Sequence, residues 1–576
     1  MSVVYKKDLL SSIDDFQKVG NNFGPGANLT FFLSLINLHT TANNRWHVKI
    51  KLTEPGDYYL KETLYVNCDF TIEGCENARI IVDFPDNGSY SDDCFIHFSN
   101  SNSSGMKTRC NTIIKNVTFG VSENHHWRTL NEQPAELHYI KVYAPKSLYL
   151  ENVRMSLEGH PITNIDIRNG QNVLIKNCVL ENYHDNSTPI NKVGGNLWLR
   201  GKTENVEIVD NIFKKIGNDE MLGFFGHYSD DNILPSEEIP ADGICRKGNI
   251  LVANNVFEYG ASGTTAASVS NDCLFSLTDS PSNEQQTYSH RFENILFESN
   301  KFIINDLVLR LFFCKNEENT IIRDVRFVNN NINYNDFMAT TSESTPFLSC
   351  QIFEFNNLNY DVDSKYQVVG NSVYNKSKIK NGTQPGLYFL LQNGGEAVVA
   401  NNKVAIFVDD NEYQQFRKII FFWVNYMNTK LTIEHNNLEE LYLFGSISCP
   451  TTTGDRIINK MDLLVKGNIV KGDSRIYNNN VGELNVSIED NYFEAERDVI
   501  AFQEYGTSGK LRYISNHVVS KYSGSPSFYY SVTGCNANHV CIVNNVFENL
   551  TSSILTILNN YVSSTIRKEI YNIYLN

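Results

Sequence analysis

A short motif that returns about every thirty residues limits the possible folds of this 576-residue chain more than any other feature. Each copy has alternating apolar residues, an asparagine and another apolar pair, as in EIVDNIF around Asn211 and LVANNVF around Asn255. The 14 copies are spaced 23 to 45 residues apart. Their asparagines are Asn116, Asn152, Asn177, Asn211, Asn255, Asn300, Asn330, Asn371, Asn402, Asn436, Asn468, Asn491, Asn516 and Asn545. Self-similarity at such a period is typical of a solenoid, in which each repeat buries its apolar face against its neighbours.

The residues between the copies indicate that the repeat is built from strands. A second short apolar segment lies between many copies, as in LWLRG (197–201) and CLFSL (273–277). Helical periodicity of useful length is absent, leucine spacing is irregular, and two or three short strands per repeat are too few for a propeller blade. Parallel strands joined by crossovers coil with a right hand. The sequence therefore predicts an all-β, right-handed parallel β-helix of about 14 or more rungs, with the motif asparagines stacked from rung to rung.

This repeat also decides the expected domain organisation. Length alone predicts about four domains, but a solenoid grows by stacking further coils. We expect residues 46–560 to form the β-helix, residues 1–45 to form an N-terminal cap or attachment segment, and residues 561–576 to form a C-terminal cap.

The charge balance and the apolar runs exclude several classes of partner. The chain has 65 acidic and 49 basic residues and a net charge of −16, so it lacks the basic footprint that nucleic acids and anionic membranes require. The longest apolar runs fall short of the ~18 residues that span a membrane. The opening MSVVYKKDLLSSIDDFQK lacks the apolar core of a signal peptide, so we expect synthesis in the cytosol.

Cysteine and histidine patterns predict neither a metal site nor a cofactor. The 12 cysteines include no CxxC pair, and Cys178 and Cys541 lie inside strand patterns, which favours buried free thiols. The adjacent histidines of HHWR (125–128) lack the spacing of metal ligands. No phosphate-binding loop occurs, and we expect no cofactor.

The opening coils resemble a known family. Residues 50–84, IKLTEPGDYYLKETLYVNCDFTIEGCENARIIVDF, are similar to the first coils of the pectate-lyase-like right-handed parallel β-helix superfamily. The Pro55-Gly56 turn and TIEG (71–74) carry the likeness, and the asparagine motif extends it over residues 46–550. The resemblance implies the fold and a polysaccharide-related role, because the superfamily contains lyases, hydrolases, epimerases and bacteriophage tailspikes. It does not choose among these activities.

The motif also predicts a column of polar residues. The residues eight positions after three consecutive motif asparagines are His160, Asp185 and Asp219, which follow Asn152, Asn177 and Asn211. Stacked carboxylates raise the pKa of at least one member, as a general acid requires. The distance between two carboxylates on adjacent rungs approaches the ~5 Å between the catalytic carboxylates of retaining glycosidases. Carboxylates two rungs apart fall near the separation found in inverting glycosidases. We predict Asp185, Asp219 and the adjacent Glu220 as catalytic residues and His160 as a substrate contact.

Other residues suited to sugars lie nearby in the sequence. Arg168 and Arg200 end the segments IDIR and LWLR, 32 residues apart, or about one rung. Arginine can bind a carboxylate through two hydrogen bonds, and the family resemblance also allows it to act as a base. Aromatic faces and a long segment, residues 227–248, complete the predicted binding set, which is His160, Arg168, Trp198, Arg200, Tyr228 and Asp242. The alternative is that these carboxylates form turns or a structural ion network.

Three functions agree with these features. The first is a phage tail spike-like protein that recognises, with or without cleaving, a bacterial surface polysaccharide. The second is a bacterial polysaccharide lyase or glycoside hydrolase, and the third is a non-catalytic structural or adhesive β-helix. The expected lack of a signal peptide favours the first, because phage products leave the host by lysis.

The tail-spike hypothesis carries expectations about partners and location. The partners would be a bacterial surface glycan and a phage tail or baseplate protein bound through the N-terminus. The location would be the virion. Exposed phenylalanine and tyrosine side chains in the second strands would offer flat faces for a homotrimer.

Overall fold

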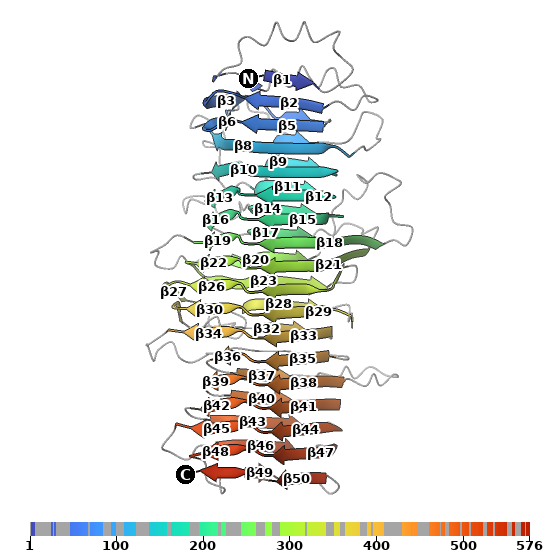
Figure 1. Ribbon diagram of the computed structural model, residues 1–576, viewed down its shortest axis with the longest axis vertical. Helices are drawn as coiled ribbons and strands as arrows, with labels where there is room; N and C mark the ends of the chain where they lie inside the picture. Colours follow the sequence, from blue (N-terminus) through green and yellow to red (C-terminus); the bar gives the residue numbers. More distant parts are fainter. Residues whose placement is uncertain are drawn as a thin grey trace. The chain divides into compact units, whose positions relative to one another are not determined.

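The structure is a computed structural model, and the elements with bounds in the part of the chain that it describes are strands (Figure 1). It describes residues 2–5, 25–26, 28–29, 47–66, 69–83, 94–98, 109–122, 138–157, 163–183, 195–216, 220–225, 244–260, 271–278, 289–316, 320–340, 351–357, 363–380, 389–392, 395–407, 429–438, 441–445, 460–472, 474–478, 483–495, 498–505, 508–521, 527–533, 536–549, 556–558, 566–570 and 572–575. Within these ranges no helix is long and apolar enough to cross a membrane.

The chain divides into two compact units. The first contains residues 1–262, 271–296 and 300–302, and the second contains residues 263–270, 297–299 and 303–576.

In the first unit, successive strands pair in parallel with the strand one coil later. One set is β1 (Ser2–Tyr5), β2 (His47–Leu52), β3 (Gly56–Leu60), β5 (Asp69–Gly74), β6 (Ala78–Val82), β8 (Asn111–Val121), β10 (Ser147–Leu157), β12 (Asn172–Lys176), β13 (Val179–Tyr183), β15 (Glu204–Val209), β16 (Ile212–Ile216), β18 (Ile244–Ala253) and β19 (Val256–Tyr259). The other set is β4 (Leu64–Val66), β7 (Cys94–Phe98), β9 (His138–Tyr143), β11 (Thr163–Arg168), β14 (Leu197–Arg200), β17 (Leu222–Phe225) and β20 (Asn271–Thr278). Strand β1 differs, because it lies antiparallel to β2. Two further strands, β21 (Ser289–Glu298) and β22 (Lys301–Ile304), contain residues of both units.

The second unit repeats this arrangement. Its first set is β24 (Thr320–Ile322), β25 (Val325–Val328), β26 (Asn331–Tyr334), β29 (Lys365–Val369), β30 (Ser372–Asn375), β33 (Gly395–Ala400), β34 (Lys403–Ile406), β35 (Thr429–Glu434), β36 (Asn437–Leu438), β38 (Lys460–Lys466), β39 (Ile469–Lys471), β41 (Glu483–Glu489), β42 (Tyr492–Ala495), β44 (Ser508–Ile514), β45 (His517–Ser520), β47 (Asn536–Val543), β48 (Val546–Glu548), β50 (Ile566–Ile570) and β51 (Ile573–Leu575). The others are β23 (Val308–Asn316), β28 (Gln351–Asn357) and β32 (Phe389–Gln392), then β37 (Leu441–Gly445), β40 (Ser474–Asn478), β43 (Asp498–Tyr505), β46 (Ser527–Thr533) and β49 (Thr556–Leu558), and the pair β27 (Met338–Thr340) and β31 (Lys378–Lys380).

Pairing of each strand with its equivalent one coil later confirms the predicted fold, an all-β right-handed parallel β-helix. The parallel pairing continues into β50 and β51, which pair with β47 and β48. The predicted segment boundaries at residues 45 and 560 stay a prediction.

Large apolar side chains fill the interior of the coils. In the first unit the rings of Phe213, Phe257 and Phe302 stack, with centroid distances of 4.9 and 5.2 Å. The second-strand residues Phe224 and Phe275 of the first unit are 1% exposed. These two rings therefore belong to the core and do not supply the exposed faces on which the trimer expectation rested.

The predicted asparagine column is present in both units. It runs through Asn211, Asn255 and Asn300 in the first unit and from Asn330 to Asn572 in the second. The amide of Asn255 donates to the carbonyl of Ile208 at 2.8 Å and to Oδ1 of Asn300 at 3.0 Å. Its own Oδ1 accepts from the backbone N–H and the Nδ2 of Asn211, both at 2.9 Å. The four hydrogen bonds occupy both donors and both lone pairs of the buried amide.

The first three motif asparagines do not belong to this column. Asn116, Asn152 and Asn177 are exposed and have φ values of 52 to 55°. In the coil that contains Asn177, the column position is occupied by Cys178, whose backbone N–H donates to Oδ1 of Asn211 at 2.8 Å. Asparagine tolerates the left-handed conformation, so the same residue type suits both the bend and the adjacent column position. The predicted alignment of these three copies was wrong by one residue.

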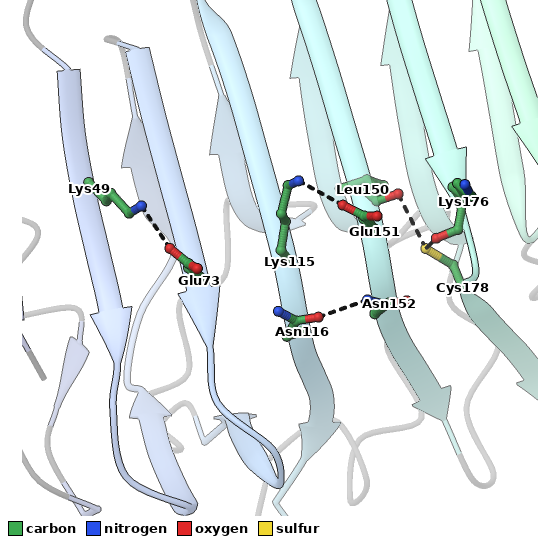
Figure 2. Close-up of polar contacts among 9 residues, drawn as sticks. All are labelled: Lys49, Glu73, Lys115, Asn116, Leu150, Glu151, Asn152, Lys176 and Cys178. Atoms are coloured by element: carbon green, nitrogen blue, oxygen red, sulfur yellow. Dashed lines mark hydrogen bonds and ion pairs between the residues drawn. The ribbon is translucent and has the colours of Figure 1, made fainter.

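Lysine and glutamate alternate along the outer face of the early coils (Figure 2). Lys49 pairs with Glu73 at 2.7 Å, and Lys115 pairs with Glu151 at 2.6 Å. These hydrogen bonds lower the pKa of both glutamates. The side chains are a third or more exposed, so each pair contributes little to stability, and we assign this face a structural role.

The described cysteines are free, as the sequence predicted, and Cys178, Cys273 and Cys314 are buried, but Cys541 is only half-buried. Burial raises the pKa of the Cys178 thiol to about 12, and its sulfur lies 3.2 Å from the carbonyl oxygen of Lys176 (Figure 2). This thiol is therefore protonated and unreactive near neutral pH.

Candidate functional site

Four of the predicted site residues lie on or just before neighbouring strands of the first unit. Arg168 ends β11, Trp198 and Arg200 belong to β14, and Glu220 lies two residues before β17. The other predicted residues fall outside the described residues. They are His160, Asp185, Asp219, Tyr228 and Asp242.

Strand register brings the two arginines side by side. Arg168 pairs with Arg200, and Asp166 pairs with Trp198 on the same strands. Side chains alternate along a strand, and Ile165 is a fully buried core residue. Asp166, Arg168, Trp198 and Arg200 therefore point away from the coil interior, and the prediction that the arginines occupy neighbouring rungs is confirmed.

These outward-pointing side chains are nevertheless enclosed. Asp166 is 0% exposed, Arg168 2% and Arg200 6%. Trp198 and Lys141, which pairs with Asp166 from β9, are each 5% exposed. Burial of this many charged groups on the outer face of a sheet is rare unless the charges pair with one another.

Asp166 is the centre of this cluster. Its Oδ2 accepts a hydrogen bond from Nε of Arg168 at 3.0 Å, and its Oδ1 lies 3.4 Å from Nε of Arg200. The imidazole Nε2 of His138 is 3.8 Å from Oδ2. Burial by itself would raise the pKa of Asp166, but the nearby cations, Arg200 first, outweigh it and hold the pKa at about 2.

Aromatic rings support both guanidinium groups. The Cζ of Arg168 lies 4.8 Å from the ring centre of Tyr143, and the Cζ of Arg200 lies 4.4 Å from that of Trp198. His138 contacts the other side of the network, with its ring 5.7 Å from that of Trp198 at 71°. Arg168 is thus held by a hydrogen bond to Asp166 and by an aromatic face, whereas Arg200 stacks on its ring and is close to Asp166 without a hydrogen bond between its Nε and that carboxylate.

Glu220 lies at the edge of the cluster. A methyl group on Gly195 would overlap with the indole nitrogen of Trp198 and with the carbonyl oxygen of Glu220, so glycine is required there for the two to approach. Oε1 of Glu220 accepts from the hydroxyl of Ser276 at 3.2 Å. Glu220 and Tyr143 are partly exposed, in contrast to the residues between them.

Asp166 is poorly suited to a catalytic carboxylate pair. It is fully buried, and strand register places Ser276, the partner of Glu220, three strands from it. An aspartate with a pKa of about 2 is also a poor general acid or base at neutral pH.

The predicted column of His160, Asp185 and Asp219 rests on the misaligned motif. The last described pair of strands β13 and β16 is Tyr183 opposite Ile216. Asp185 follows Tyr183 by two residues, whereas Asp219 follows Ile216 by three. Asn177 and Asn211 therefore do not occupy equivalent positions, so the equal distance of eight residues is no reason to expect Asp185 and Asp219 to stack. That argument for stacking the two carboxylates was wrong.

A second buried carboxylate lies on the outer face of β13. Glu181 is 4% exposed and contacts Arg154 at 3.1 Å and Lys214 at 3.3 Å. Burial opposes its ionisation, but a hydrogen bond from Ser156 and the contacts with Arg154 lower its pKa overall. Arg154 is 55% exposed, so this is an ordinary surface ion pair that is covered on one side.

Sequence reasoning missed Asp166, His138, Lys141 and Tyr143. A usable signal existed, because Asp166 and Arg168 are two residues apart in IDIR and share one face of the strand. Among the described residues, no group of three histidine, cysteine or acidic side chains could hold a metal ion.

Comparisons with known proteins give fold-level likeness alone. No protein-family model matches the sequence, and no curated protein matches it significantly. The chain is similar in structure to the surface protein and adhesin PfbA of Streptococcus pneumoniae, with 12% identity, a TM-score of 0.31, and coverage of 89% of this chain and 98% of that one. It is also similar to the PL6 family alginate lyase AlyGC, with 11% identity, a TM-score of 0.22, and coverage of 91% and 84%. At these scores neither likeness carries an argument about function.

Proposed function

We propose that this protein is a tail spike-like β-helix that recognises a neutral or weakly charged bacterial surface polysaccharide. The site is the outer face of β9, β11, β14 and the start of β17. The observation that carries the proposal is the arrangement of two arginines, each stacked on an aromatic ring, around the buried carboxylate of Asp166. Planar guanidinium groups and aromatic faces are residue types that bind sugar hydroxyls and sugar rings.

Burial of the cluster places the sugar contacts at its edges. Arg168, Trp198 and Arg200 expose 2 to 6% of their surface, whereas Tyr143 and Glu220 are partly exposed. We assign direct contact to Tyr143 and Glu220, and we assign the enclosed cluster the task of holding the edges rigid. Binding sites on rigid elements lose little entropy when a ligand binds.

The described carboxylates favour recognition of the polysaccharide over its cleavage. Asp166 is ionised, fully buried and enclosed by cations, which makes it a poor general acid or base. A polysaccharide lyase or hydrolase remains the alternative that rests on Asp185 and Asp219.

The experiment is a binding assay on an array of purified bacterial capsular and O-antigen polysaccharides. We expect the chain to bind at least one of them, and Tyr143→Ala and Glu220→Gln to weaken that binding by about tenfold or more, a loss of ~1.4 kcal/mol. Glu151→Gln is the matched control, because Glu151 is a partly exposed, ion-paired carboxylate on the outer face of β10. Edge variants that bind as tightly as the control would contradict the proposed site.

The oligomeric state follows as a separate proposal. We propose a homotrimer, although the described rings Phe224 and Phe275 are buried and cannot form its interface. Sedimentation equilibrium at micromolar concentration should give three times the chain mass, and a monomer would contradict it.

A further inference from the structure

A row of asparagine amides crosses four coils of the first unit, on a different sheet from β9, β11 and β14. Its members are Asn172, Asn205, Asn249 and Asn294, in β12, β15, β18 and β21, and all four are exposed. Each Nδ2 donates to Oδ1 of the asparagine one coil earlier, at 3.3 Å for Asn205, 3.1 Å for Asn249 and 3.4 Å for Asn294. This amide row therefore presents the same polar group to solvent once per coil.

The inner members of the amide row use half of their hydrogen-bonding capacity within the protein. An asparagine amide has two N–H donors and two acceptor lone pairs. Asn255 in the buried column uses all four. Asn205 instead donates once, to Asn172, and accepts once, from Asn249. Each inner member thus keeps one N–H and one lone pair for a ligand or for water.

Backbone conformation explains part of the amide row but not all of it. Asn205, Asn249 and Asn294 have φ values of 54 to 57°, a left-handed conformation that asparagine tolerates. The φ of Asn172 is not positive. Its amide donates to the carbonyl oxygen of Lys146 at 2.9 Å and accepts from Asn205. Asparagine thus continues the row at a position where the backbone does not require it.

A second row of outward-pointing side chains lies beside the amides and is mostly apolar. Side chains alternate along a strand, so the residue two positions after each asparagine is its neighbour on the outer face. This apolar row runs from Tyr149 to Leu174 and Leu251 and is interrupted by Glu207. Tyr149 is 38% exposed, and both leucines are partly exposed. Polar amides and apolar surface therefore lie side by side over successive coils.

This face carries no net charge, in contrast to the chain as a whole. At the outward positions that follow the asparagines of β12, β15 and β18, Lys176 and Glu207 are the charged residues, and their charges cancel. The whole chain has a net charge of −16, so an uncharged face suits an uncharged ligand better than an ion. The lysine–glutamate pairs of the early coils keep their structural role, and Glu151 is not among these contacts.

We infer that the amide row and the apolar row form a second carbohydrate-binding surface, whose ligand is a linear, uncharged polysaccharide lying along the stack of coils. Sugar hydroxyls both donate and accept, as the remaining N–H and lone pair of each amide require. The C–H faces of sugar rings fit the ring of Tyr149 and the leucines. Equivalent groups recur every ~4.8 Å, so successive sugar units meet the same chemistry. This surface goes beyond the proposed function, because it lies on another sheet and uses other residues.

The test is affinity electrophoresis in gels that contain hydroxyethylcellulose, glucomannan or dextran, which are uncharged polysaccharides with different backbones. We expect at least one of them to retard the wild-type chain. The double variant Asn205→Gly/Asn249→Gly removes two amides and keeps the left-handed backbone, because glycine adopts positive φ freely. We expect this variant and Tyr149→Ala each to weaken binding by about tenfold.

The matched control is Asn116→Gly/Asn152→Gly. These two asparagines are also exposed and left-handed, and Nδ2 of Asn152 donates to Oδ1 of Asn116 at 2.9 Å (Figure 2). They lie next to Lys115 and Glu151 in the sequence, outside the two rows. We expect the control to bind within about twofold of the wild type. An equal loss in the control would show that the glycines act through stability, which would overturn the inference, as would wild-type affinity in Asn205→Gly/Asn249→Gly.

Tyr143→Ala and Glu220→Gln in the same gels separate this inference from the proposed function. If these two variants alone weaken binding, the amide surface is wrong and the proposed site stands. If Asn205→Gly/Asn249→Gly and Tyr149→Ala alone weaken it, the amide surface stands and the proposed site is wrong for these ligands. A wild-type chain that none of the gels retards would overturn the inference, while the polysaccharide array still tests the proposed function.

Discussion

Removing one asparagine from the buried column should destabilise the second unit more than an ordinary point substitution. Asn468 is 0% exposed. Its amide donates to Ile433 O and to Oδ1 of Asn491, and its Oδ1 accepts from the backbone N–H and Nδ2 of Asn436, all at 2.9 Å. Asn468→Ala therefore removes a partner from four buried groups. At about 1 kcal/mol or somewhat more for each, we expect a loss of ~4 to 6 kcal/mol.

The assay must resolve local opening, because stability in a stacked repeat is distributed among neighbouring coils. Amide hydrogen exchange of peptides from residues 429–472 measures the free energy of opening of the coils around Asn468. The control is Asn437→Ala. Asn437 follows the column residue Asn436 in the sequence and is only partly buried in β36, so its substitution should change the free energy of unfolding by less than ~0.5 kcal/mol. If Asn468→Ala and Asn437→Ala differ by less than ~1 kcal/mol, the buried amide column does not stabilise the coils as argued.

Three further predictions follow from the core and the site. Phe257→Ala should cost ~3 to 5 kcal/mol in thermal unfolding, because the ring is 0% exposed and stacked on both sides, and Phe257→Asp should abolish soluble folding. The pKa of Asp166 falls from 3.8 to about 2 on folding, so its ~2 kcal/mol of stability is fully present above pH ~4 and is lost as the pH falls toward 2. Asp166→Asn should flatten that part of the melting-temperature profile, and an unchanged profile would refute the assignment. Asp185→Asn and Asp219→Asn should abolish any glycan cleavage without lowering the melting temperature if these residues are catalytic, whereas normal cleavage by both variants would exclude them.

The fold can be predicted from the sequence because asparagine recurs at the same structural position in successive coils. A buried asparagine fits the column only where each coil has the same bend, so its recurrence indicates a parallel β-helix before any strand is assigned. Asn572 lies 27 residues after Asn545, within the spacing of the motif, but its segment, IYNIYL, was assigned to the predicted C-terminal cap. Asn177 misled the alignment, because asparagine is equally suited to the left-handed bend one residue before the column.

The site was harder to predict because alternation in the sequence shows which residues face outward but not whether an outward-facing residue is exposed or covered. In IDIR, Asp166 alternates with Ile165 and Ile167 as a solvent-facing residue would. The structure instead encloses it completely among cations from two neighbouring strands. Pairing of Arg168 with Arg200 was predictable from their spacing, but their shared contact with one carboxylate required the three-dimensional register.

Polysaccharide binding at the outer face of β9, β11, β14 and the start of β17 can be seen in a crystal structure of the protein with a bound oligosaccharide. We expect sugar density over this face, within hydrogen-bond distance of Tyr143 or Glu220, with Arg168 still hydrogen-bonded to Asp166. Sugar density confined to another part of the chain, with this face unchanged and empty, would contradict the proposed site.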